Sequence, residues 1–231
     1  TSTDSGNNSG WIFSDGGGGP GPGPLPNFDQ KHFKIYQNNG GLNLADSYAA
    51  QDTNFNIEIN TIFRIRFQIA NTGAGSGDIV RRLKFKEDSG PWTGITNNSN
   101  NVRLADSSYF VDGASTVSRL TATGTFVAGQ GKDIISDTTQ ILIANGSYTE
   151  DEYALILQTE AVGHGYQFRI TDAGSDLNIY SATPSINSPD STPPIPSNFS
   201  PLNGAIIKTK AHIIIFSLNE KGDCRLALFL K

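Results

Sequence analysis

The run FNIEINTIFRIRFQI, residues 55–69, decides the fold class of this chain. Every second position from Phe55 to Ile69 is large and apolar except Thr61, and most of the positions between them are polar. A period of two places one set of side chains on a buried face, so it predicts one long β-strand or two collinear strands. The polar set, which includes Arg64 and Arg66, is expected on the opposite face.

Shorter runs of similar character occur on both sides of this stretch, and turn signals such as Asp112-Gly113 and Asn145-Gly146 separate them. About eight or nine short strands without a long helical period predict an all-β fold, an antiparallel β-sandwich of immunoglobulin or jelly-roll type. The further candidate strands are 33–37, 79–86, 109–111, 117–123, 134–143, 153–159, 166–171 and 177–180.

The composition supports strands and turns and argues against several other classes. Of the 231 residues, 36% are hydrophobic, 17% are charged and 25 are glycine, which does not suit a coiled coil or helical bundle. The net charge of −5 argues against nucleic-acid binding. No run reaches the roughly 18 apolar residues of a membrane span. The single cysteine, Cys224, excludes an intrachain disulfide, and the lack of methionine predicts a processed or trimmed product.

Four segments are predicted along the chain. Residues 1–26 form a Gly/Pro-rich extended arm, 27–187 the β-sandwich, 188–200 a Pro-rich connector, and 201–231 a β-hairpin or partial Ig-like domain. The arm contains one apolar island, Trp11, Ile12 and Phe13, which packs either on its own domain or on a neighbour.

The C-terminal hairpin is predicted from two apolar runs, His212–Leu218 and Cys224–Leu230. A lone hairpin is marginal in water and its bare apolar strands would aggregate. Three explanations remain open: the hairpin packs on the sandwich, it begins a truncated second domain, or another subunit completes its sheet.

Two resemblances add to this interpretation. The run FRIRFQIANTG, residues 63–73, resembles the strand ending in N-T-G in β-sandwich modules of large cell-surface proteins from uncultured bacterial lineages, and FVAGQG (126–131) and YQFRITDAG (166–174) are similar to the same kind of module. The runs DSTPP (190–194), SPLNGA (200–205) and FSLNE (216–220) resemble the start of bacterial Ig-like repeats. Together these resemblances imply a cell-surface or extracellular structural protein rather than a metabolic enzyme.

Catalytic, cofactor-binding and metal-binding residues are all expected to be absent. His32, His164 and His212 are far apart and lack metal-ligand spacing, and no nucleophile motif occurs. Glu150-Asp151-Glu152 and Glu87-Asp88 are interpreted as solvated acidic turns, with Ca²⁺ binding through hard oxygen ligands as the alternative. Trp92, beside a Gly-Pro turn, is either a structural residue or a platform for a sugar ring.

The leading hypothesis is a non-catalytic, extracellular structural protein that forms a surface filament or pilus-like polymer with copies of itself, assembled by strand donation. The alternative is an adhesin or carbohydrate-binding module that contacts a surface glycan through Trp92. The residues predicted to mediate assembly are Trp11, Ile12, Phe13, Ile213, Ile215, Leu226 and Leu228.

Overall fold

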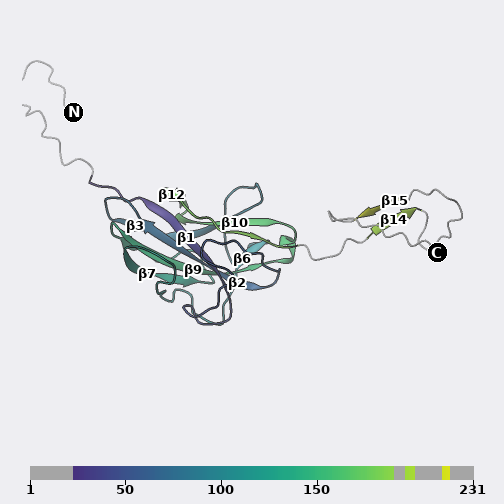
Figure 1. Cartoon of the computed structure of the whole chain (residues 1–231), viewed down its shortest axis with the longest axis horizontal. Coiled ribbons are helices and arrows are strands. Elements are labelled where there is room, and N and C mark those ends of the chain that lie inside the picture. Colours follow the sequence, from purple (N-terminus) through teal and green to yellow (C-terminus); the bar gives the residue numbers. More distant parts are fainter. Residues whose placement is uncertain (1–22, 190–195, 201–214, 219–231) are drawn as a thin grey trace, which may run out of the picture. The chain divides into compact units, whose positions relative to one another are not determined.

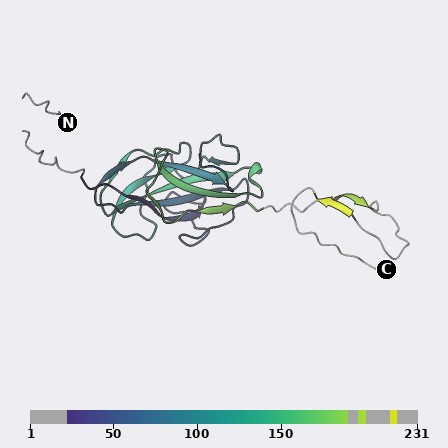
Figure 2. The same cartoon turned by 90° about the horizontal axis from the view of Figure 1, so that it is seen from above.

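The computed structural model describes residues 23–189, 196–200 and 215–218. The chain divides into two units, Thr1–Pro189 and Asp190–Lys231. In the described part of the first unit the regular structure is β-strand, apart from one turn of 3-10 helix at Thr159–Ala161. The predicted all-β sandwich class is confirmed, and Figures 1 and 2 show its curled sheets from two directions.

The larger sheet has six strands in the order β12-β1-β2-β9-β6, and β7 also pairs with β9. Its strands are β1 (Phe28–Gln37), β2 (Ile62–Asn71), β6 (Val102–Leu104), β7 (Thr125–Lys132), β9 (Ser147–Leu157) and β12 (Ile179–Tyr180). β2 is antiparallel to both of its neighbours, β1 and β9. β7 runs parallel to β9, and β12 runs parallel to β1, so this sheet is mixed.

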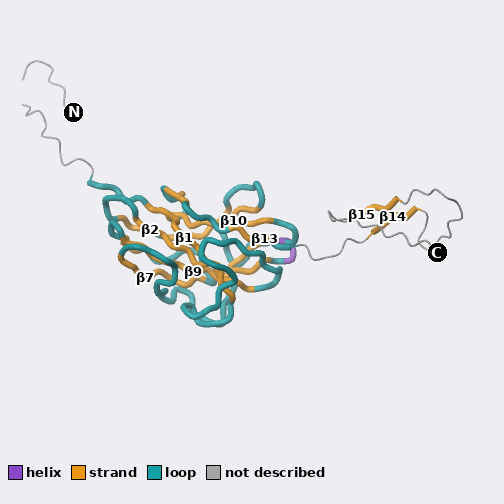
Figure 3. Tube along the Cα trace, viewed as in Figure 1, coloured by secondary structure: helices purple, strands orange, loops and turns teal. Residues whose placement is uncertain are grey.

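The second sheet has five strands in the order β11-β10-β4-β5, and β13 also pairs with β10. Its strands are β4 (Arg81–Glu87), β5 (Thr93–Gly94), β10 (Gly165–Asp172), β11 (Ser175–Asp176) and β13 (Ser185–Asn187). A separate two-stranded ladder joins β3 (Gly77–Ile79) to β8 (Ile141–Ile143). Figure 3 shows how much of the remaining chain is loop.

The hydrophobic core lies between the two sheets. Phe63, Ile65, Phe67 and Ile69 of β2 are fully buried in it, as the alternation predicts. From the second sheet, the inward-facing residues Leu83, Phe85, Tyr166, Phe168 and Ile170 join the same cluster. For the predicted strands at 79–86 and 166–171, the residues expected to face the core are therefore confirmed as buried.

Two loops cover the outer face of the larger sheet. One loop, 38–52, follows β1, and the other, 105–121, precedes β7. Leu42 and Leu120 from these loops are buried. Because of this cover, the outward-facing Arg64 and Arg66 of β2 have no exposed surface.

The first half of the predicted strand at 55–69 is irregular, and β2 begins only at Ile62. Ile57 is nevertheless buried, and its N–H donates to the carbonyl of Asn187 (3.1 Å). Asn60 adopts a left-handed conformation (φ 58°), which asparagine tolerates better than most residues. The chain turns there, so the alternation located apolar side chains correctly but placed the strand's start too early.

The predicted strands at 109–111 and 117–123 are loops, whereas β7 was missed. β7 contains two glycines, which normally weaken a strand. At Gly129, however, a Cβ atom would lie 2.1 Å from the carbonyl oxygen of Glu150. Glycine is needed at this position because β7 and β9 approach closely. The residue type that made a strand seem unfavourable is therefore the one that this strand requires.

In the second unit, β14 (Pro196–Ser200) pairs antiparallel with β15 (Ile215–Leu218). β14 lies in the stretch predicted as connector, and Pro196 stands at its first position, where a strand tolerates proline. The partner run predicted for β15, Cys224–Leu230, lies outside the described residues. Among the described residues, no helix has the length and apolar character needed to cross a membrane.

Candidate functional site

Four charged side chains form a buried charge layer on the outer face of the larger sheet: Arg64 and Arg66 on β2, and Glu150 and Glu152 on β9. None of the four has exposed side-chain surface. Glu152 accepts from Arg64 Nη1 (3.0 Å) and Arg66 Nε (2.7 Å), and Glu150 accepts from Arg66 Nη1 (3.2 Å). Buried charges persist only when they are paired and hydrogen-bonded, and this layer meets both conditions.

The two arginines also bind the loop that covers them. Arg64 Nη2 donates to the carbonyl of Gly40 (2.6 Å), and Arg66 Nη2 donates to that of Leu42 (3.0 Å). A third contact, from Arg66 Nη1 to the carbonyl of Val117 (2.6 Å), reaches the second loop. The planar guanidinium offers five N–H donors in a fixed fork, against three on the compact ammonium of a lysine, so one arginine can reach a carboxylate and a loop carbonyl together.

Glu150 binds the second covering loop, residues 105–121, to the sheet. Its carboxylate accepts the backbone N–H groups of Arg119 (2.9 Å) and Leu120 (3.1 Å) as well as the hydroxyl of Ser118 (3.3 Å). The charge layer therefore attaches both loops to the sheet.

Asp151, between the two glutamates, points to the other face of β9 and joins the two sheets. It accepts from Arg81 Nε and Nη2, both at 2.9 Å, and from the N–H of Gln130 (2.8 Å). Burial alone would lower the pKa of Arg81, but the charge and hydrogen bonds of Asp151 outweigh it and raise that pKa.

The prediction of an acidic turn at Glu150-Asp151-Glu152 is therefore wrong. These residues lie in the middle of β9, with their carboxylates engaged by arginines. Acidic residues are depleted in strands, which favours a turn when they are considered alone. The signal that could have placed these residues lies on another strand. Arg64 and Arg66 stand at alternate positions of β2, and arginine is well suited to buried ion pairs with carboxylates.

At the end of the sandwich where the chain enters, Asn71 acts as a clasp. Its Oδ1 accepts the N–H groups of Asn27 and Gly73 (both 3.1 Å), and its Nδ2 donates to the carbonyls of Gly75 (2.8 Å) and Ile143 (2.9 Å). At Gly73 a Cβ atom would lie 2.4 Å from the nitrogen of Asn27. The N-T-G run thus has a structural role, which is to hold the incoming chain against β2 and β8.

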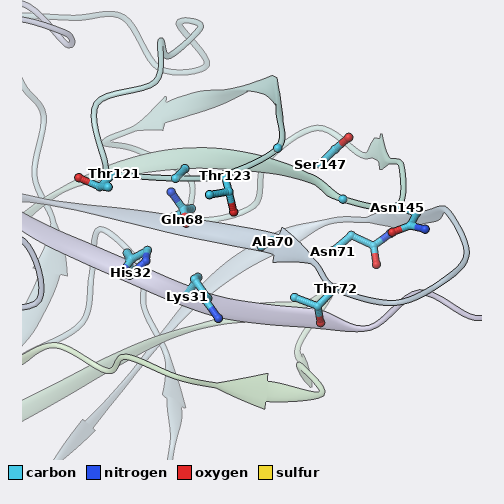
Figure 4. Close-up of a pocket in the computed structure, with 13 residues that line it drawn as sticks. Lys31, His32, Gln68, Ala70, Asn71, Thr72, Thr121, Thr123, Asn145 and Ser147 are labelled. Carbon is cyan, nitrogen blue, oxygen red and sulfur yellow. The ribbon is translucent and has the colours of Figure 1, made fainter.

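Beside this clasp lies a pocket of about 430 Å³, called the entry pocket here. Its floor is the uncovered end of β1 and β2, and its walls are the 121–124 segment and the turn before β9 (Figure 4). The lining residues are Lys31, His32, Gln68, Ala70, Asn71, Thr72, Thr121, Ala122, Thr123, Gly124, Asn145, Gly146 and Ser147. No sequence signal pointed to it, because its residues come from four separate segments.

Trp92 is half-buried against the outer face of the second sheet. The Arg169 guanidinium lies 4.2 Å from its ring centroid and the Lys86 ammonium 5.4 Å. Arg169 also lies 5.2 Å from the ring centroid of Tyr180 and donates to Asp176 (2.5 Å). The indole is thus already in contact with cations of its own chain.

A third polar group lies where β4 ends and β10 begins. His164 Nδ1 is 2.8 Å from Asp88 Oδ2 and 3.2 Å from Glu87 Oε1, all partly exposed. The hydrogen bond with Asp88 raises the pKa of His164, and the same bond lowers the pKa of Asp88. His32 is likewise paired, with Asp52 (2.6 Å).

The residues predicted to mediate assembly fall mostly outside the described part of the chain. Only Ile215 is described, as the first residue of β15, opposite Ser200 in the register. The others, Trp11, Ile12, Phe13, Ile213, Leu226 and Leu228, lie in the undescribed stretches.

Comparisons of the chain with protein-family models, with curated proteins and with solved structures find no match.

Proposed function

We propose that this protein is a non-catalytic structural component of an extracellular surface polymer, in which copies are joined through the segments that flank the sandwich. The observation that supports this is the placement of the chain's entry and exit. The entering segment is held at Asn71, the last residue of β2. The leaving segment contacts Ile57, which lies before the start of β2, through the carbonyl of Asn187.

The described chain thus enters and leaves the sandwich at opposite ends, as Figure 1 shows. Both segments are attached to the sandwich by backbone bonds: Thr72 N–H donates to Asn27 at one end (2.8 Å), and Ser188 N–H donates to His164 at the other (3.0 Å). Flanking segments that start at opposite ends of a module favour head-to-tail contacts, which can extend into a filament.

The sandwich also has a strand edge that could receive a donated strand. The edge of β1 is covered, because Tyr48 N–H donates to Ile35 (3.0 Å) and Gln37 N–H donates to Asp46 (2.8 Å). In β7, by contrast, residues 125–128 pair with β9 on one side and with no other described strand. Such an edge is the usual template for strand addition.

The test is negative-stain electron microscopy of the purified full chain and of two variants. Deletion of residues 1–15, or the pair Ile213→Asp and Ile215→Asp, should abolish polymers while the sandwich keeps its melting temperature. The matched control is Val111→Asp, because Val111 is an exposed apolar residue of the sandwich itself. Polymers that persist in both variants, or a wild-type chain that stays monodisperse, would contradict the proposal.

A second candidate, an adhesin or carbohydrate-binding module, is supported by the contact of Trp92 with Arg169. A partly exposed ring beside cations can hold an acidic sugar through stacking and charge. A glycan array probed with wild type and Trp92→Ala separates this candidate from the first, because loss of signal in the variant is expected only for a ligand that contacts Trp92.

A further inference from the structure

We infer that the entry pocket binds a neutral, hydroxyl-rich ligand of monosaccharide size. Its volume of about 430 Å³ falls within the usual range of small-molecule sites. The pocket lies on the outer face of the larger sheet, so it is a different site from the Trp92 surface on the second sheet. Ligand binding in the pocket does not require polymer formation.

Gln68 is the residue that most clearly indicates a ligand. It lines the pocket between Thr121 and Thr123 in Figure 4, yet only 2% of it is exposed. Its Nε2 atom is buried and has no hydrogen-bond partner among the described residues. Leaving a buried amide donor unpaired is unfavourable, and such groups are rare in folded proteins. Because the terminal amide can rotate, either its nitrogen or its oxygen can meet a ligand hydroxyl, which both donates and accepts.

The rest of the lining favours an uncharged, polar ligand. The walls carry the hydroxyls of Thr121, Thr123 and Ser147, and none of the described lining residues carries a carboxylate. Its two basic residues are each next to an acid outside the pocket: Lys31 Nζ is 3.6 Å from Asp29, and His32 is bonded to Asp52. With its basic groups paired, the pocket offers hydrogen bonds rather than a net charge.

The walls are held in place before any ligand arrives. The 121–124 segment follows directly from the loop bound by Glu150, and Thr121 N–H donates to Gln51 Oε1 (2.7 Å). At its other end, Gly124 (φ 109°) packs so closely that a Cβ atom would lie 2.0 Å from the carbonyl oxygen of Gly146. A preformed pocket avoids the entropy cost of ordering on binding. Through Glu150, which binds the residues just before Thr121, the buried charge layer thus helps to hold one wall of this pocket.

The experiment is a chemical-shift titration of the full chain with D-glucose, D-galactose and N-acetyl-D-glucosamine, each to about 100 mM, a concentration that detects even millimolar affinities. The variant is Gln68→Met, which keeps the side chain's length and removes the amide. The matched control is Gln167→Met, which makes the same change on the outer face of the second sheet, opposite Lys86. Ala70→Leu, which fills the pocket floor, is the second test variant.

We expect saturable shifts at the lining residues with at least one sugar in wild type and Gln167→Met, and at least tenfold weaker binding in Gln68→Met and Ala70→Leu. Gln68→Met should also melt at the same or a higher temperature, because it removes an unpaired buried donor. Absence of saturable shifts with all three sugars would overturn the inference. A clearly lower melting temperature for Gln68→Met would do the same, because the amide would then be paired within the fold. Shifts that centre on Trp92 and persist in Gln68→Met would also overturn the inference, because the sugar would then bind the second sheet and not the entry pocket.

Discussion

Two strands of this protein carry nearly the same alternation, and their outward-facing side chains lie in opposite environments. β2 contains FRIRFQI (63–69) and β4 contains RLKFKE (82–87), and both place large apolar residues in the core at every second position. On β2 the intervening cations Arg64 and Arg66 are fully buried, whereas on β4 Lys84 and Lys86 remain partly exposed. Alternation therefore shows which face belongs to the core, but it does not show whether the other face meets water.

The partners across each ladder explain the difference. Arg66 lies directly opposite Glu152, so opposite charges face one another and can be covered. Lys84 lies opposite Arg169, a like-charge pair that would be unfavourable if buried. Arg169 instead donates to Asp176 and contacts Trp92, and Lys84 donates to the carbonyl of Gly174 (2.7 Å). The loops cover the part of the outer face in which the buried charges, two arginines and two glutamates, cancel.

The largest expected effect comes from removing one charge of the buried layer. Glu152→Gln leaves two buried guanidinium groups without their shared carboxylate, so we expect a loss of about 3 kcal/mol in the free energy of unfolding. The matched change on the outer face of the second sheet is Asp137→Asn. It removes the ion-pair partner of the half-exposed Arg82 on β4 and should cost less than about 1 kcal/mol. Urea denaturation measures the free energy of unfolding of both variants. Similar losses would mean that the charges on the outer face of the larger sheet are no more buried than those on the second sheet.

A smaller effect distinguishes the shape of the cation from its charge. Arg66→Lys keeps the charge but loses the fork that bonds Leu42 and Val117, so we expect a loss of about 2 kcal/mol. The reciprocal change, Lys84→Arg, is partly exposed and should stay within about 0.5 kcal/mol of wild type. The same denaturation experiment applies. Amide hydrogen exchange in loops 38–52 and 105–121 should also rise in Arg66→Lys only, and unchanged exchange there would show that the arginine does not hold the loops.

The smallest effect concerns the exposed pair of His164 and Asp88 at the end of the second sheet. Because the pKa of His164 is raised by Asp88, the pair stabilises the fold fully below the unfolded value of 6.5, and the contribution disappears as pH rises through the raised folded-state pKa. Melting temperatures from pH 5 to 9 should therefore decline slightly more in wild type than in Asp88→Asn. The acid Glu87, 3.2 Å from the same nitrogen, remains in the variant and limits the difference. Identical pH profiles would mean that the pair is not formed in solution.

The strong inward faces were predictable from the sequence, because residues 63–69, 79–86 and 166–171 alternate over several positions. The boundaries were less predictable. The alternation in the sequence runs from 55 to 69, but the left-handed Asn60 interrupts the extended backbone, so β2 starts only after it. Gly129 lies in β7, whose two glycines argue against a strand. Of the candidate site, Trp92 could be located but its cationic neighbours could not. Gln68 gave no signal at all, because its significance comes from Thr121, Thr123 and Ser147, which are more than 50 positions away.

The sequence by itself determined that this is an all-β chain with a two-faced central strand, because the period of side chains along an extended backbone is a local property. Only the tertiary structure decided that Glu150-Asp151-Glu152 is the middle of a buried strand, with Asp151 joining the sheets and its neighbours holding the loops. The free energy of a buried charge depends on the groups that surround it in space, and those groups come from segments that the sequence does not place together.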